Sequence, residues 1–168
     1  MKNKFKLLSL ILLVGLLGAL VSGCAANITR NEDGSLTIET SMPADSLQAE
    51  IQAAIADPLI EELTAQLQSG YINVSGVRKR LNSDQTDTLS FRLDLGVSKG
   101  HLTATISNAL IDGQPMDADR VSLWNERIAN RLESFGQRRS NSSLQSVSVT
   151  SEAIEMVWRV ETARSQGN

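Results

Sequence analysis

Few side chains in this sequence could carry out covalent chemistry. His101 is the only histidine and Cys24 is the only cysteine. A nucleophile with a histidine base, or a metal site built from histidines and thiolates, needs more of these side chains than the chain has. A disulfide within the chain is excluded for the same reason. We therefore expect no catalytic residue, no metal site and no cofactor, and we interpret His101 as a solvent-facing residue at the start of a strand.

Two pairs of acidic residues could in principle hydrolyse a glycosidic bond, a reaction that uses two carboxyl groups in different protonation states. The pairs are Glu61 with Glu62 and Asp117 with Asp119. Each pair falls where a helix is expected to begin, and carboxylates are favourable at the positive end of a helix dipole. We interpret both pairs as parts of helix starts and turns, and we expect that the protein is not an enzyme.

The charge of the chain limits its partners. It has 16 Lys and Arg against 19 Asp and Glu, and residues 1–24 hold three of the lysines and no acid. The remainder is therefore acidic, with a net charge of −6. The basic runs Arg78-Lys79-Arg80 and Arg138-Arg139 are short and contain no aromatic residues, so we expect no nucleic-acid partner. These runs are interpreted as solvated loops, with contact to lipid headgroups or to an acidic partner as the alternative.

The N-terminal residues are typical of a secretory signal peptide. Lys2, Lys4 and Lys6 form a basic start, and residues 7–20 are almost wholly apolar. This apolar run is short for a helix that crosses a bilayer, which needs about 20 apolar residues. We therefore predict a signal peptide over residues 1–23.

The end of this segment, Val21-Ser22-Gly23-Cys24, resembles the bacterial lipobox. The resemblance implies a diacylglyceryl thioether on Cys24, cleavage before it and acylation of the new N-terminus. Several acyl chains on one residue give stable membrane attachment, so we expect an envelope lipoprotein that faces outside the cytoplasm, on the periplasmic or extracellular side. Because Ala25 rather than Asp follows Cys24, the outer membrane is favoured if the cell has two. The alternatives are an ordinary cleaved signal peptide with a chance cysteine, or an uncleaved anchor.

The rest of the chain has the length of a single domain with its own core. We expect residues 24–34 to form the lipidated N-terminus and a short tether, in which Ile28 could begin a first strand. Residues 35–162 are expected to form one α+β domain, and residues 163–168 form a polar tail. The alternation of residues 35–40 predicts the first full strand of the domain.

A long kinked helix is predicted to follow this strand. Six aliphatic residues are spaced by four, which is close to the period of a helix. They are Leu47, Ile51, Ile55, Leu59, Leu63 and Leu67. The Asp57-Pro58 step breaks the helix, because Pro58 has no backbone N–H and disfavours helical backbone in the residue before it. We therefore expect a helix over residues 45–56, a kink, and a second helix over residues 58–68.

The remaining pattern predicts strands and one more helix. Residues 71–111 alternate between apolar and polar side chains and are interrupted by turns, which is typical of an antiparallel meander. Asp117 or Asp119 is expected to start a helix that ends at Gly136, with residues such as Trp124 and Ile128 on its buried face. Closing strands follow, around residues 147–149 and 154–160. The predicted fold is α+β, with a curved antiparallel sheet (a meander) packed on a long kinked helix and a second C-terminal helix.

This arrangement resembles the small LmeA-like phospholipid-binding proteins of the tubular lipid-binding superfamily. The resemblance covers most of residues 33–161. It is based on Asp33-Gly34-Ser35-Leu36-Thr37-Ile38, Pro43-Ala44-Asp45-Ser46-Leu47, Asp112-Gly113-Gln114-Pro115 and Trp124-Asn125. It implies that a curved sheet wraps a helix and that acyl chains are held in the groove between them.

Two functions therefore remain open. In the first, the protein binds an apolar ligand, in particular an acyl lipid such as a phospholipid. In the second, its core is filled and it is an interaction or assembly module with partners on its polar faces. In the first case, large apolar residues on inward faces would line the groove. They are Leu47, Ile51, Ile55, Leu63, Phe91, Leu93, Ile106, Trp124, Met156 and Trp158. The sequence indicates membrane contact through the Cys24 acyl chains and says nothing about the oligomeric state.

Overall fold

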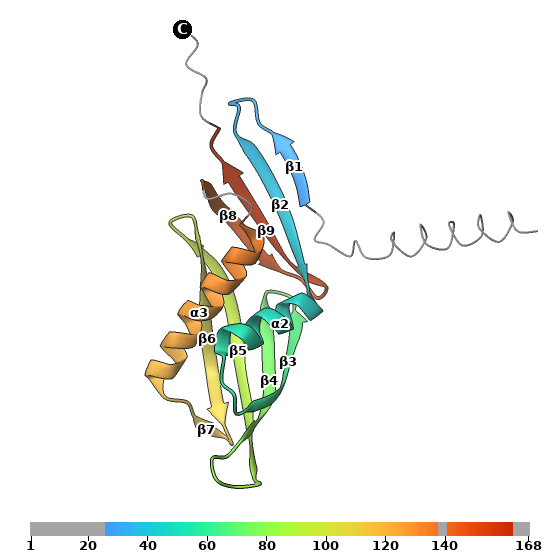
Figure 1. Cartoon of the computed structure of the whole chain (residues 1–168). Coiled ribbons are helices and arrows are strands. Elements are labelled where there is room, and N and C mark those ends of the chain that lie inside the picture. Colours follow the sequence, from blue (N-terminus) through green and yellow to red (C-terminus); the bar gives the residue numbers. More distant parts are fainter. Residues whose placement is uncertain (1–25, 138–140, 163–168) are drawn as a thin grey trace, which may run out of the picture.

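The computed structural model describes residues 26–137 and 141–162, which form two antiparallel sheets and two helices (Figure 1). The predicted signal peptide, Cys24, and the polar tail at residues 163–168 lie outside the described residues. The α+β class and the antiparallel arrangement are confirmed. The strands are divided between two sheets that are packed on the same pair of helices.

The first sheet has four strands in the order β1-β2-β9-β8. Its strands are β1 (Ala26–Arg30), β2 (Leu36–Pro43), β8 (Ser142–Val149) and β9 (Ala153–Val160). Ile38 of β2 is opposite Trp158 of β9 and Ile28 of β1, so these three side chains share one face of the sheet. β1 lies within the stretch expected as a tether, and only Cys24 and Ala25 separate it from the predicted signal peptide.

The second sheet has five strands in the order β3-β4-β5-β6-β7. Its strands are β3 (Ile60–Gln68), β4 (Tyr71–Lys79), β5 (Thr86–Ser98), β6 (His101–Ile111) and β7 (Gln114–Pro115). The meander predicted over residues 71–111 is confirmed as β4, β5 and β6. Two backbone hydrogen bonds connect the two sheets, from Leu144 N to Gly100 O at 2.7 Å and from Gly70 N to Val149 O at 2.8 Å.

The prediction of a second helix over residues 58–68 is wrong, because residues 60–68 form the strand β3. Helix α2 (Ala44–Ile55) ends at Ala56, which has a left-handed φ of 48°. The spacing of four between Leu63 and Leu67 fits a strand as well as a helix, since every second residue of a strand is on the same face. Between them, Ala65 is also buried while Thr64 and Gln66 are exposed, and β4 supplies the hydrogen bonds of the strand.

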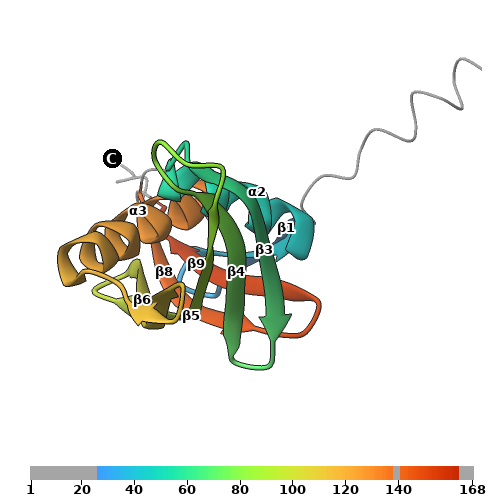
Figure 2. The same cartoon turned by 90° about the horizontal axis from the view of Figure 1, so that it is seen from below.

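Helix α3 (Ala118–Gly136) begins as predicted. The Asp117 side chain accepts hydrogen bonds from the backbone N–H groups of Asp119 and Arg120, at 3.0 and 3.1 Å. An aspartate in this position stabilises the first turn of a helix, where four N–H groups lack intrahelical partners. Helices α2 and α3 lie on the same side of the curved five-stranded sheet, as Figure 2 shows.

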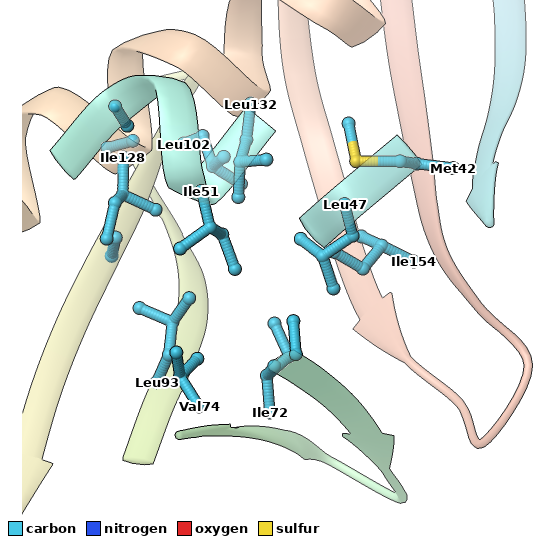
Figure 3. Packing of buried hydrophobic residues seen from close by; sticks show 14 of the residues in the cluster. Met42, Leu47, Ile51, Ile72, Val74, Leu93, Leu102, Ile128, Leu132 and Ile154 are labelled. Carbon is cyan, nitrogen blue, oxygen red and sulfur yellow. The ribbon is translucent and has the colours of Figure 1, made fainter. Parts of the chain in front are cut away.

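The two helices and both sheets enclose one hydrophobic core. In the close view of Figure 3, Leu47 and Ile51 of α2 lie between Ile128 and Leu132 of α3, Ile72 and Leu93 of the five-stranded sheet, and Ile154 of β9. Each of these side chains is at most 1% exposed to solvent. The core therefore includes side chains from every layer of the domain.

Gly76 is expected to tolerate no side chain. A Cβ atom added there would lie 2.6 Å from the backbone oxygen of Glu62, at the irregularity of β3 where the register shifts between Ile60 and Glu62. Backbone atoms cannot move aside as the end of a side chain can, so we expect Gly76→Ala to lower the free energy of unfolding by about 1–3 kcal/mol. Urea denaturation measures this difference. The neighbouring exposed residue provides a matched control, and Ser75→Ala should change the stability by less than about 0.5 kcal/mol. Equal stabilities of the two variants would contradict the close approach of β3 and β4.

Candidate functional site

The ten residues predicted to line a ligand groove all belong to the hydrophobic core. None of them is more than 7% exposed. They are Leu47, Ile51, Ile55, Leu63, Phe91, Leu93, Ile106, Trp124, Met156 and Trp158. Their sequence pattern correctly indicated that they face inward, but it could not distinguish the wall of a cavity from a packed interior.

Contacts between the large side chains favour a packed interior. Trp158 donates a hydrogen bond from Nε1 to Oγ1 of Thr40, at 3.1 Å in a buried position. The rings of Phe91 and Trp124 lie 6.0 Å apart at an angle of 50°, within the range of favourable aromatic pairs. Every buried side-chain nitrogen and oxygen of the described residues has a hydrogen-bond partner. The aromatic residues that could have held a ligand therefore contact one another and their polar neighbours.

Three hollows at the helices have volumes of about 240, 340 and 460 Å3. None of the ten predicted residues lines these three hollows. The hollow between α3 and β6, for example, is bordered by the polar residues Asn125, Glu126 and Asn130, with the buried Leu102, Ala104 and Ala129 at its base. Two further hollows each reach one of the ten: Met156 borders a hollow of about 490 Å3 beside β1, β2 and β9, and Phe91 borders one of about 480 Å3 on the five-stranded sheet. None of these hollows is lined mainly by the ten predicted residues, as the apolar groove that the resemblance implies would be.

The hollow of about 480 Å3, with both polar and apolar lining residues, lies on the outer face of the five-stranded sheet. Gln66, Asn73 and Asn108 are among the residues that line it, and all three are exposed. Asn108 has a left-handed φ of 53°, near the irregular pairing of β5 and β6. Such irregularities redirect side chains relative to a regular ladder. The hollow therefore presents several amide groups that can donate and accept hydrogen bonds with a partner.

Arg92 and Tyr71 are among the residues that line this hollow. The guanidinium group of Arg92 lies 4.1 Å from the centre of the Tyr71 ring. It also donates hydrogen bonds to both carboxylate oxygens of Asp94, and these bonds lower the pKa of Asp94. Because the charge of Arg92 is balanced by Asp94, the surface suits a polar partner better than a strongly charged one.

The interpretation of the basic run Arg78-Lys79-Arg80 as a solvated loop is wrong for Arg78 and Lys79, which end β4, and acidic residues neutralise the whole run. Arg78 Nε lies 3.3 Å from a carboxylate oxygen of Asp57, and Lys79 pairs with Glu61. Arg80 contacts Asp87, and it also binds Asp112 and Gln85, each at 3.1 Å. These pairs connect the turn between β4 and β5 to neighbouring segments, which gives the run a structural role.

The acidic pairs are separated from one another and serve different local roles. Glu61 and Glu62 lie in β3, so their interpretation as part of a helix start is wrong. Asp117 caps α3, as predicted. Nδ1 of His101 lies 2.9 Å from a carboxylate oxygen of Glu133, and its side chain is 71% exposed, as its predicted solvent-facing position requires. Within the described residues, no three His, Cys, Asp or Glu side chains are close enough to hold a metal ion.

Three polar helix residues that bond sheet edges were not predicted from the sequence. Glu133 accepts a hydrogen bond from the backbone N–H of Leu102, and Asn125 accepts one from Ile106, at 2.9 and 2.8 Å. The side-chain oxygen of Gln48 in α2 accepts a hydrogen bond from the backbone N–H of Ala65 in β3, at 3.4 Å. No local pattern indicates this role, because it depends on which strand lies beside the helix.

Comparisons with known proteins do not assign the chain to a family. No protein-family model matches it, and no curated protein or solved structure shows a significant match. In the part of the chain that the structure describes, neither helix is long and apolar enough to cross a membrane. The lipobox and the LmeA-like resemblance therefore stay predictions from the sequence.

Proposed function

We propose that this protein is a non-enzymatic envelope lipoprotein, held at the membrane by acyl chains on Cys24, whose domain acts as an interaction module through its outer surfaces. The observation that supports this proposal best is the placement of the ten candidate lining residues in one packed core. A carrier of acyl chains needs an apolar cavity, and ligand pockets are typically about 300–1,000 Å3 in volume. The filled core therefore favours the interaction module over the lipid carrier.

The outer face of the five-stranded sheet supports the same proposal. It presents the hollow of about 480 Å3, with the exposed amides of Asn73 and Asn108 and the charge-balanced Arg92 at its surface. Interfaces between proteins that associate reversibly are about as polar as the rest of the surface, and arginine and tyrosine are enriched in them. This face is the proposed contact surface for a polar partner in the envelope.

Native mass spectrometry of the purified lipoprotein tests the filled core. The protein, after incubation with phospholipid vesicles and release in detergent, is expected to have the same mass under native and denaturing conditions. A noncovalent lipid would add its mass under native conditions only, whereas the acyl chains on Cys24 add to both measurements. A phospholipid adduct that is lost on denaturation would contradict the filled core and support the carrier.

A further inference from the structure

We propose that β1 pairs antiparallel with the β1 strand of a second copy of this chain anchored in the same membrane leaflet. This inference rests on the proposed function for the anchor at Cys24. It concerns a different surface, the free edge of the four-stranded sheet (Figure 1). Edge strands present unpaired N–H and C=O groups, and proteins usually cover them or block them.

The long strands at the other edges of the two sheets each make hydrogen bonds to a neighbouring element. Beyond its short pairing with β7, β6 donates N–H groups from Leu102 and Ile106 to side chains of α3. The backbone N–H of Ala65 in β3 is bonded by Gln48 of α2. β8 is bonded to the turns of the five-stranded sheet through the Leu144–Gly100 and Gly70–Val149 hydrogen bonds.

In contrast, β1 is uncovered in the part of the chain that the structure describes. All five of its residues are exposed, and Ile28 is 62% exposed. Apart from the pairing with β2, no hydrogen bond or ion pair within residues 26–137 and 141–162 involves β1. The strand contains no proline or lysine, which are common blocking residues at sheet edges, and its one charged residue, Arg30, is its last. Its sequence, Ala-Asn-Ile-Thr-Arg, therefore leaves the edge open to a further strand.

β1 is complementary to itself in the antiparallel direction. A register centred on Ile28 places the two Ile28 side chains opposite each other, Asn27 opposite Thr29, and Ala26 opposite Arg30. No like charges are opposed, and direct cross-strand neighbours have Cβ atoms about 4.5–5.5 Å apart. Because Ile28 shares a face with the buried Ile38, pairing extends the apolar side of the sheet across the two copies.

The position of the anchor is compatible with this pairing. Cys24 precedes Ala26 by two residues, so it lies within about 8 Å of the start of β1. In the proposed register, the two Ala26 residues are four positions apart along the strands, or about 14 Å. Both acylated cysteines can therefore enter the same leaflet when the paired strands lie along the membrane surface.

The small size of the interface makes the membrane essential to the pairing. A strand of five residues buries much less than the ~800 Å2 per partner of a stable protein interface. Anchoring confines the copies to one surface, which raises their effective concentration without new contacts. We therefore expect pairing in the membrane and little pairing once the anchor is removed.

Disulfide cross-linking in native membranes tests the pairing. Acylated Cys24 has no free thiol, so the Ile28→Cys variant has a single reactive cysteine that faces its own copy across the two-fold axis. A disulfide joins Cβ atoms about 3.5–4.5 Å apart, a distance that cross-strand neighbours reach with a small adjustment. Mild oxidation of the full-length variant should convert most of it to a homodimer on non-reducing gels.

Leu81→Cys provides the matched control, because Leu81 is 72% exposed and lies in the turn between β4 and β5, far from β1. We expect at least fivefold more dimer for Ile28→Cys than for Leu81→Cys, and a several-fold fall when Ile28→Cys is combined with Cys24→Ser. Equal cross-linking of the two exposed positions overturns the pairing, as does a cross-link from Ile28→Cys to a different protein. Membrane fractionation of the same samples tests the anchor. Attached protein without the dimer contradicts the pairing alone, whereas processed protein in the soluble fraction contradicts both the anchor and the pairing.

Discussion

Replacement of Trp158 with alanine is expected to lower the free energy of unfolding by about 3–5 kcal/mol. Trp158 is 1% exposed, so the variant loses the transfer free energy of an indole ring and leaves a cavity in the core. The neighbouring helix end cannot easily fill this space, because Gly136 of α3 has no side chain and lies directly against the ring. The substitution also removes the hydrogen-bond donor to Thr40. Urea denaturation followed by circular dichroism measures the change.

Two further variants separate the causes of this loss. Trp158→Phe keeps most of the apolar volume and removes the donor to Thr40, so it should be less damaging than Trp158→Ala. Glu155→Ala, at an exposed position of the same strand, should change the stability by less than about 0.5 kcal/mol. If Trp158→Ala lowered the free energy of unfolding by less than about 1 kcal/mol, the result would contradict a tightly packed site and would support the lipid carrier instead.

Replacement of Cys24 with serine is expected to abolish lipid anchoring. A serine hydroxyl cannot form the thioether that the lipobox resemblance implies, and in the proposed function the acyl chains on that thioether hold the domain at the membrane. The protein should therefore stay unprocessed or appear in the soluble fraction. Fractionation of cells, with detection of the leader by its mass, distinguishes these two outcomes.

The control for this experiment is Ser22, which is part of the same motif but carries no lipid. Ser22→Ala keeps a small residue at that position and should leave processing and attachment unchanged. Processed Cys24→Ser protein that remains attached to the membrane would refute the lipid anchor. It would leave the packed core unaffected, because the core lies entirely in the described domain.

Much of the fold could be predicted because its signals are local. The alternation in β5, from Leu89 to Leu95, places every second side chain in the core. The buried stripe of α3 and the cap at Asp117 follow from the helical period and from the unpaired N–H groups of the first turn. A neighbourhood of a few residues contains all the information needed for each of these predictions.

The β3 strand shows where local signals fail. Leu63 and Leu67 satisfy the helical and the strand period equally, and Asp57-Pro58 fits a kink as well as the end of a helix. The decision depends on β4, which is adjacent in sequence and offers a full ladder of hydrogen bonds to residues 62–68. Gly76 permits this pairing, because its missing side chain lets the backbone of Glu62 approach.

The same difference between local and long-range information applies to the candidate site. The acidic charge, the lone cysteine behind an apolar run, the position of the single histidine and the inward face of each large apolar residue follow from the sequence alone. Three features depend on how the chain folds. The apolar residues fill one core, side chains of α2 and α3 bond the edges of β3 and β6, and β1 is uncovered within residues 26–137 and 141–162. The reason is physical. Periodicity and capping depend on neighbours within a turn or a strand, whereas packing and edge protection depend on residues that meet only after the chain has folded.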